Sequence, residues 1–245
     1  MKRFISILLA VLIALTFAAC SGKTENTQSS VGEASPDKMQ TILTPAEYVL
    51  YQNIFYNDQG GEHVGKEVTK TGIFTCIHDE FNSMTRYYVW GYNDNTKCCD
   101  WQWEIVPEST ENLPPVGSTV NASGIFAQND NALDGYWIEN VKIEVLSEYK
   151  KSTADIDMTT MGGTLERVQI VNMQNFKDKF EGKTVAAYGR IESPTSLQHP
   201  YYDGAFSQQF ETKDEVQAFG TVVIVSGVYS GGVITDAAVS PTSDY

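Results

Sequence analysis

One glycine-spaced pattern occurs four times in this chain and constrains its fold more than any other feature. The pattern is G-x-x-V-x-x-x-G followed by one or two apolar residues, and its copies are GKEVTKTGIF from Gly65, GSTVNASGIF from Gly117, GKTVAAYGRI from Gly182 and GTVVIVSGVY from Gly220. In each copy the first glycine suits a turn that enters a strand, and the valine suits a buried pleated face. The second glycine permits the bulge or sharp bend that small barrels need. Four copies in two pairs predict a duplicated β-barrel, with each pair supplying two corresponding strands of one barrel.

The paired motifs resemble the first and fourth strands of an OB-fold, a five-stranded Greek-key barrel. The second half, from EGKTVAAYGRI to FGTVVIVSGVYSGGVITDAAV, resembles the tRNA-anticodon-binding-like OB family, many of whose members are bacterial lipoproteins. The first half, with GKEVTKTGIF, YYVWGY, KCCDWQWEIVP and GSTVNASGIF, resembles another OB-type domain of Gram-positive lipoproteins, in which a Cys-Cys pair begins the third strand. The resemblance implies a mainly β fold of two tandem five-stranded barrels, each preceded by a short helix. It does not imply that this chain binds tRNA.

The first twenty residues, MKRFISILLAVLIALTFAAC, have the order of an export signal. Lys2 and Arg3 precede an apolar run that ends at Ala19 and is too short for a permanent membrane span. The end of this run, FAAC, resembles a bacterial lipobox with Phe17 in place of the usual leucine. The resemblance implies removal of residues 1–19 and lipid attachment at Cys20, which would hold the protein on the extracytoplasmic side of the cell membrane. An ordinary secretory signal with a coincidental cysteine is the alternative.

The acidity of the chain narrows the classes of partner that we expect. The full sequence has 17 basic and 31 acidic residues, and removal of the signal with Lys2 and Arg3 leaves 15 basic residues. Affinity for nucleic acid comes mainly from Lys and Arg that neutralise phosphates, so nucleic acid is not an expected partner. Attachment to the membrane should rest on the acyl chains rather than on a basic surface. The remaining expectation is a protein partner or an extended envelope-associated ligand.

Composition also predicts the boundaries of the domains. Residues 20–43 comprise the lipidated cysteine and a polar stretch without apolar period, which predicts a flexible tether. The sequence TPAE from Thr44 matches a capping box that opens a short helix, so the first OB-like domain is expected over 44–148. A polar and then Gly-rich segment predicts a linker over 149–163. The second OB-like domain is expected over 164–240, with a helical segment from Leu165 to Phe180 and a tail of residues 241–245.

The aromatic residues of the first half predict a ligand-binding face. We expect strands near Arg86–Tyr92 and Cys98–Val106, with Tyr92 opposite Lys97 across a four-residue turn. In that register Trp90 faces Cys99, Tyr88 faces Trp101 and Arg86 faces Trp103. One face would then gather the candidate binding aromatics, which are Tyr88, Trp90, Tyr92, Trp101 and Trp103. OB-folds bind elongated ligands on this second-strand and third-strand surface. The alternative is that the same face is the core of the barrel.

The cysteines leave three interpretations open. Cys76 and His78, together with Cys98 and Cys99, supply soft ligands that could complete a tetrahedral zinc site, although their spacing is not a recognised zinc motif. A disulfide from Cys76 to one member of the pair is the second interpretation, and small buried thiols are the third. A zinc-handling accessory lipoprotein is therefore the alternative function, and apart from zinc no cofactor is expected.

Nothing in the sequence predicts an enzyme. The three histidines, His63, His78 and His199, lie in no nucleophile elbow, HExxH helix or triad signature. The many carboxylates show no spacing that singles out a catalytic pair. We therefore expect a protein that works by binding and has no catalytic residues.

Overall fold

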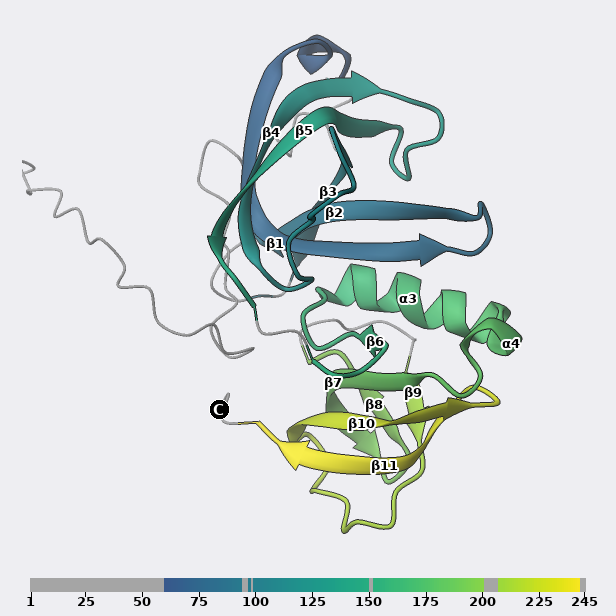
Figure 1. Cartoon of the computed structure of the whole chain (residues 1–245). Coiled ribbons are helices and arrows are strands. Elements are labelled where there is room, and N and C mark those ends of the chain that lie inside the picture. The colour runs from purple at the N-terminus through teal and green to yellow at the C-terminus, as the bar shows by residue number, and fades with distance from the viewer. Residues whose placement is uncertain (1–59, 94–96, 98, 150–151, 201–206, 243–245) are drawn as a thin grey trace, which may run out of the picture. The chain divides into compact units, whose positions relative to one another are not determined.

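The computed structural model describes residues 60–93, 97, 99–149, 152–200 and 207–242 (Figure 1). All of the described residues belong to one compact unit. The predicted signal, the lipid-attachment residue Cys20, the tether and the helix expected from Thr44 lie outside the described residues. Within the described part of the chain no helix is long and apolar enough to cross a membrane.

The first sheet is a closed barrel of five strands in the order β1-β2-β3-β5-β4. A short 3-10 helix, η3 (Gly60–His63), precedes it. Neighbouring strands pair antiparallel, except for the parallel pair β3 and β5. This arrangement is that of an OB-like barrel. The strands are β1 (Glu67–Asp79), β2 (Met84–Tyr92), β3 (Asp100–Pro107), β4 (Thr119–Gln128) and β5 (Tyr136–Ser147).

The second sheet has six strands in the order β10-β11-β9-β8-β7-β6. An additional pairing of β10 with β7 gives strands β7 to β11 the same cyclic order as the first barrel, again with one parallel pair, β9 and β11. Strand β6 lies outside this cycle and pairs parallel with β7. The mainly β fold class and the two OB-like sheets are therefore confirmed. The strands are β6 (Ile156–Asp157), β7 (Thr184–Ser193), β8 (Ser196–Gln198), β9 (Gln208–Phe210), β10 (Val222–Ser230) and β11 (Val233–Pro241).

The repeated glycine motifs lie on the first and fourth strands of each sheet, and they pair with one another there. Between β1 and β4, Val68 lies opposite Gly124 and Gly72 lies opposite Val120. The same reciprocal pairing recurs between β7 and β10, where Val185 lies opposite Gly227 and Gly189 lies opposite Val223. A valine thus faces a glycine at each of the four contacts, so the repeat encodes the pairing of these strands as well as their ends.

The two glycines of each motif have the separate roles that their positions predict. The first glycines all have positive φ, between 77° and 94°. This is the left-handed region that glycine enters at no steric cost. A Cβ at Gly72 would lie 2.7 Å from the carbonyl oxygen of Trp90, so the second glycine allows two strands to approach closely. The pairing of β4 with β5 shifts register at Gly124, and that of β10 with β11 shifts at Gly227, as a bulge does.

Helix α3 (Gly163–Asn175) and the short helix α4 (Lys177–Phe180) precede β7, where the sequence predicted a helical segment. Helix α3 lies between the two sheets (Figure 1). The segment 149–163, assigned to a linker from its composition, contains β6 and the buried residues Met158 and Met161. These methionines belong to one hydrophobic core with α3 and with residues of both sheets, among them Trp90 and Tyr229.

The predicted register of β2 with β3 is wrong. Tyr92 pairs with Asp100 rather than with Lys97, Trp90 pairs with Gln102, and Tyr88 pairs with Glu104. The connection between the strands is longer than the expected four-residue turn, since the Asn93 backbone N–H donates to the Cys99 carbonyl at 3.0 Å. The shift of three positions is odd, and side chains alternate along a strand, so the tryptophans of β3 move to the opposite face from the aromatics of β2.

Candidate binding site

The five aromatics that the sequence placed on one ligand-binding face are buried in two different cores. Trp101 and Trp103 belong to the core inside the first barrel. The aromatics of β2 belong to the core shared with α3 and the second sheet. The exposed fractions are 1% for Tyr88, 3% for Trp90, 6% for Tyr92, 0% for Trp101 and 2% for Trp103. The prediction of one open aromatic face is therefore wrong, because α3 covers the face on which such a ligand would lie.

The N-terminus of α3 is held by a residue of the first barrel. The Asp100 carboxylate accepts hydrogen bonds from the Thr164 backbone N–H at 2.8 Å and from the Thr164 hydroxyl at 2.7 Å. Asp100 therefore caps a helix that lies some sixty residues away in the chain, and this satisfies one of the free N–H groups of the first turn. Burial raises the pKa of the Asp100 carboxyl, while the hydrogen bonds from Thr164 lower it. A Cβ at Gly162 would meet both Asp100 Oδ2, at 2.6 Å, and the Trp90 ring.

The third turn of α3 is attached to the end of β1 through Asn172. The Asn172 side-chain amide donates to the His78 carbonyl at 2.6 Å and accepts from the Glu80 backbone N–H at 3.3 Å. With the Asp100 cap, α3 is thus attached to the first barrel near both of its ends. The space left between these attachments is a cleft.

The cleft has a volume of about 480 Å³ and mostly apolar walls. Three pieces of the chain enclose it, namely the β1–β2 hairpin, the loop between β4 and β5, and one side of α3. Its volume falls within the range of about 300 to 1,000 Å³ that is typical of ligand sites. Phe81 and Leu133 line it and are 63% and 49% exposed, so apolar side chains continue out to its mouth. The apolar walls are Ile77, Phe81, Leu133, Val168 and Val171.

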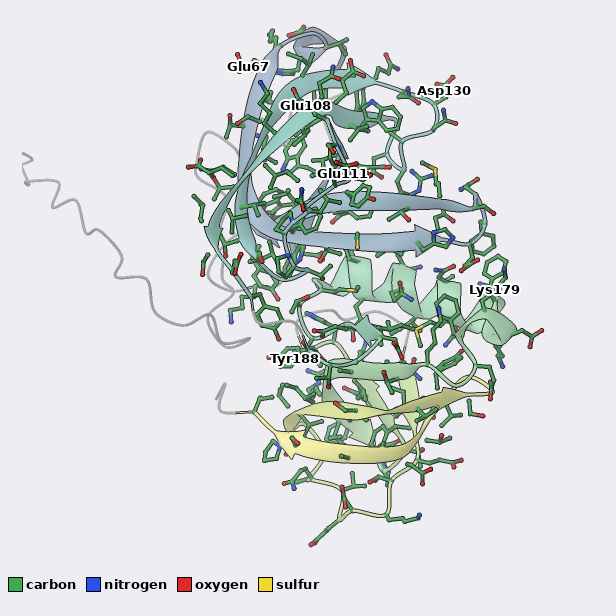
Figure 2. The ribbon with its side chains drawn as sticks, viewed as in Figure 1. Glu67, Glu108, Glu111, Asp130, Lys179 and Tyr188 are labelled. Carbon is green, nitrogen blue, oxygen red and sulfur yellow. The ribbon has the colours of Figure 1, made fainter. Side chains whose placement is uncertain are left out.

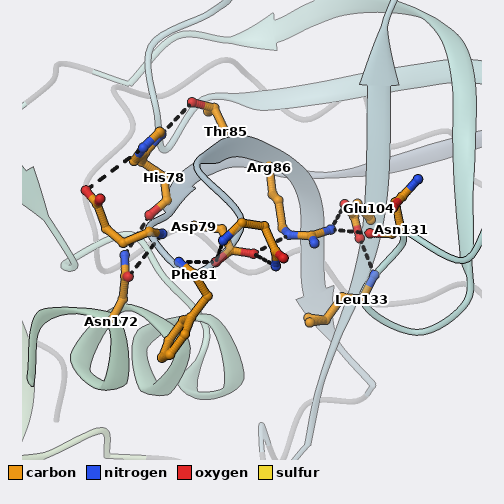
Figure 3. Close-up of polar contacts among 11 residues, drawn as sticks. His78, Asp79, Phe81, Thr85, Arg86, Glu104, Asn131, Leu133 and Asn172 are labelled. Carbon is orange, nitrogen blue, oxygen red and sulfur yellow. Dashed lines mark hydrogen bonds and ion pairs between the residues drawn. The ribbon is translucent and has the colours of Figure 1, made fainter. Parts of the chain in front are cut away.

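A buried guanidinium organises the polar side of the cleft (Figure 3). Arg86 Nε donates to Asp79 Oδ2 at 2.9 Å, and Nη1 donates to Glu104 Oε1 at 2.6 Å and to the Asn131 carbonyl at 2.8 Å. Glu104 Oε2 accepts from the Leu133 backbone N–H at 2.7 Å. Arg86 and Glu104 are only 7% and 8% exposed. This network holds the loop between β4 and β5 against β2, and it therefore holds Leu133 at the mouth of the cleft.

The network also determines which of these groups carry charge. Burial raises the pKa of the Asp79 carboxyl, but hydrogen bonds from Asn82 and Arg86 outweigh burial and leave the pKa below its ordinary value. Burial lowers the pKa of Arg86, yet the two carboxylates hold it above its ordinary value. Burial, followed by the negative charge of Glu104, raises the pKa of the Tyr88 phenol. At neutral pH the cleft therefore contains a charged guanidinium, a charged Asp79 and a neutral phenol.

Two side chains that line the cleft retain hydrogen-bond donors. Arg86 uses Nε and Nη1, and among the described residues nothing accepts a hydrogen bond from its Nη2. Tyr88 also lines the cleft and is 99% buried, and its hydroxyl likewise has no partner within the described part of the chain. Both residues lie on the same face of β2, two positions apart. An apolar cavity lined by two such residues can hold an apolar group that carries a hydrogen-bond acceptor.

The predicted zinc ligands are not brought together. Cys76 pairs with Tyr87 and Tyr87 with Ile105, whereas Cys99 lies six residues before Ile105, which is about 20 Å along the strand. Cys76 and Cys99 therefore cannot share a metal ion or a disulfide in this register. Cys76 is half-buried, Cys99 is exposed, and Cys98 lies outside the described residues. Of the described residues, no three His, Cys, Asp or Glu are arranged to hold a metal ion.

His78, the fourth predicted ligand, turns toward its neighbours on the hairpin. Its Nδ1 lies 3.2 Å from the Thr85 hydroxyl, and its Nε2 lies 3.9 Å from Glu80 Oε1 (Figure 3). The main-chain carbonyl of the same residue is the acceptor for Asn172. In this structure His78 serves the attachment of α3 through its backbone.

Sequence reasoning missed Asp79, Arg86, Glu104 and Leu133 as site residues. One signal was present, since Arg86 is an arginine within an otherwise aromatic and apolar strand and would need a buried partner. The other half of the cleft could not be found from the motifs, because it comes from α3. Elsewhere acidic side chains are spread over the surface of the first barrel, with Glu67, Glu108, Glu111 and Asp130 all exposed (Figure 2).

Comparison of the sequence with known families and curated proteins gave no match. No family model matches the chain, and no curated protein matches it significantly. The functional conclusion therefore rests on the cleft.

Proposed function

We propose that this protein is a lipid-anchored extracytoplasmic binding protein whose partner is another protein, and that the partner inserts an apolar side chain into the cleft beside α3. The observation that carries the proposal is the cleft of about 480 Å³, with apolar walls, two side chains that retain hydrogen-bond donors, and apolar residues at its mouth. A partner side chain would there bury apolar area and find a polar anchor, which is the arrangement of a binding hot spot.

The polar groups of the cleft favour binding over catalysis. Both oxygens of Asp79 accept hydrogen bonds, from Phe81, Asn82 and Arg86, and both oxygens of Glu104 accept them from Arg86 and Leu133. A catalytic acid or base must have its reacting oxygen within reach of a substrate. These carboxylates are instead committed to holding the hairpin and the loop in place, so we assign them a structural role.

The anchor belongs to the proposal and rests on the lipobox-like sequence that ends at Cys20. Cells that express the intact chain should incorporate an alkyne-labelled fatty acid into it, and the Cys20→Ala variant should lose the label and leave the membrane fraction. Labelling that persists in Cys20→Ala, or a wild-type chain without label, would refute the anchor and leave the cleft unaffected.

Two exposed leucines provide a matched test of the cleft as a partner site. Leu133 at its mouth and Leu146 on β5 are 49% and 44% exposed, and only Leu133 lines the cleft. A photo-crosslinking amino acid placed at each position in the intact chain, in the native cells, should give a discrete adduct from position 133 and none from position 146.

A second pair of variants tests whether the adduct from position 133 depends on the cavity. Val168→Trp places a bulky ring on the wall contributed by α3 and should abolish the adduct from position 133, while Leu146→Trp should leave it intact. Equal adducts from both positions, or an adduct that survives Val168→Trp, would show that the partner binds elsewhere.

A further inference from the structure

We infer that the group recognised in the cleft is an uncharged peptide segment, with an apolar side chain against the walls and a backbone carbonyl bound by Arg86 Nη2 and the Tyr88 hydroxyl. The inference rests on the proposed function and adds the chemistry of the ligand to it. Three properties of the cleft lead to it, namely its free donors, its charged groups of both signs and its apolar walls.

The polar groups that remain for a ligand are donors. Arg86 Nη2 and the Tyr88 hydroxyl have no acceptor among the described residues, although the two side chains are 93% and 99% buried. A ligand that supplies an acceptor to these two donors would add hydrogen bonds within the apolar cleft. The acceptors nearby, Asp79 and Glu104, already receive two or more hydrogen bonds each. The cleft thus offers more to a carbonyl than to an N–H group.

Charged groups of both signs surround the cleft before any ligand enters. The carboxyl groups of Asp79, Glu104 and Asp134 act on the Tyr88 phenol, and the guanidinium groups of Arg86 and Arg167 line the cleft. A ligand with a net charge would lose its hydration there and would meet groups of its own sign, whichever charge it carried. A neutral acceptor avoids this penalty. Among neutral acceptors, a backbone carbonyl is always attached next to a side chain, so one residue of a peptide satisfies the donors and the walls together.

The walls and the mouth suit a segment that continues beyond the cavity. Leu133 from the barrel and Val168 and Val171 from α3 present branched aliphatic groups on opposite sides. Phe81 at the mouth packs edge-to-face on Phe176, with ring centroids 4.6 Å apart, and still remains 63% exposed. Apolar surface at the rim would cover the residues that flank the inserted side chain.

Three small leucine derivatives with different net charges test the inference. N-acetyl-leucinamide is neutral, N-acetyl-leucine carries a carboxylate, and leucinamide carries an ammonium group at neutral pH. The measurement is a methyl-resolved NMR titration of the full-length chain in lipid nanodiscs, followed at Leu133, Val168 and Val171. The neutral probe should shift these methyl signals with a Kd at least about ten-fold lower than either charged probe. The enantiomer N-acetyl-D-leucinamide should bind more weakly, because a peptide site is chiral.

Conservative variants then assign the contact to its donor. Tyr88→Phe removes the hydroxyl but keeps the ring and should weaken the neutral probe roughly 2- to 10-fold. Because that hydroxyl has no partner among the described residues, the variant should keep the melting temperature of the parent. Tyr87→Phe is the control, since Tyr87 lies on the other face of β2 and stacks on Phe74.

The outcomes separate this inference from the proposed function. Probes that shift the cleft methyls without preference for the neutral compound, or with full affinity for Tyr88→Phe, would overturn the inference while the cleft remains a binding site. Equal binding of the two enantiomers would indicate a small molecule rather than a peptide and would also overturn it. Probes that leave all three methyl signals unchanged would count against the proposed function as well.

Discussion

Two buried titratable residues, Glu166 and His199, make the stability of this protein sensitive to pH in opposite directions. Glu166 is 2% exposed, and neither of its carboxyl oxygens has a hydrogen-bond partner among the described residues. His199 is 5% exposed and packs edge-to-face on Tyr188, with ring centroids 6.1 Å apart. Burial disfavours the charged form of each residue, so both are held neutral in the folded state.

The first prediction concerns Glu166→Gln and the loss of stability as pH rises above about 5. Burial raises the pKa of Glu166 well above its ordinary value. The unfolded chain therefore releases this proton at a lower pH than the folded chain does, and the stability contributed by the neutral carboxyl is lost as pH rises above the unfolded pKa. The loss amounts to about 1.4 kcal/mol per pH unit until the folded carboxyl ionises. Glu166→Gln removes this loss. In urea denaturation, the free energy of unfolding of the variant should therefore rise relative to that of the parent between pH 5 and pH 7. Parallel curves for parent and variant would contradict the prediction.

The second prediction concerns His199→Phe and the acid side. Burial lowers the pKa of His199 to about 4, although a hydrogen bond to the Met161 backbone opposes the shift. Between the unfolded value of about 6.5 and the folded value, only the unfolded chain binds the proton, so stability falls as pH falls through this window. The total effect is on the order of 3 kcal/mol by pH 4. The variant should start less stable at pH 7, because it loses that hydrogen bond, but its stability should fall less steeply with acid. An unchanged acid slope would show that other groups cause it.

At the scale of elements, α3 is the helix through which the second sheet is attached to the first barrel. Its first turn is capped by Asp100 of β3, and its later turns are fixed by Asn172 to the end of β1. The same helix forms one wall of the cleft. A change that loosens the N-terminus of α3 should therefore affect both stability and the shape of the site.

The third prediction compares two aspartates that make the same pair of contacts. Asp100 accepts from the backbone and the hydroxyl of Thr164, and the exposed Asp155 accepts from the backbone and the hydroxyl of Thr184. Asp100→Ala should cost about 1 to 3 kcal/mol, because a partly buried cap leaves its donors without water. Asp155→Ala should cost less, since solvent replaces the lost acceptor. Thermal unfolding measures both variants.

A double-mutant cycle shows whether the Asp100 effect passes through the cap. Thr164→Val removes the hydroxyl bond alone, so its effect should be smaller when Asp100 is already alanine. Additive losses would mean that Asp100 acts through other contacts. Equal losses in Asp100→Ala and Asp155→Ala would contradict the importance of the buried cap.

At the scale of the whole molecule, the two OB-like sheets share a hydrophobic core. This core joins residues of the first barrel such as Ile73, the methionines of the segment before α3, and residues of the second sheet such as Phe210. The core inside the first barrel is separate and is built around Trp101 and Trp103. Loss of the shared core would expose buried side chains of both sheets together.

The fourth prediction is that both sheets unfold in one cooperative transition. Calorimetry of the chain should give a single peak whose calorimetric and van't Hoff enthalpies agree. Gly162→Ala is a suitable perturbation, because a Cβ there would meet Asp100 and Trp90, and it should lower the transition as a whole. Two separate transitions, or a variant that splits the peak, would mean that each sheet is stable alone.

The glycine repeat was enough to predict a duplicated, mainly β fold, and the resemblance of its paired strands to an OB-fold supplied the order of the strands. In each sheet, the repeated glycines and the valines opposite them lie on one pair of strands. One short repeated pattern therefore specifies both strands and their pairing. The helix before β7 was predictable for a similar reason, since its signal lies within a single segment.

The site depended on two quantities that no local pattern contains. The length of the connection from Asn93 to Cys99 decides the register of β2 with β3, and an odd shift moved Trp101 and Trp103 from the expected binding face into the barrel core. The packing of α3 determines where the cleft lies, because it brings together residues as distant in the chain as His78 and Asn172. Helix α3 covers the predicted aromatic surface, and the cleft beside Arg86 exists only because the helix and the barrel leave that space between them.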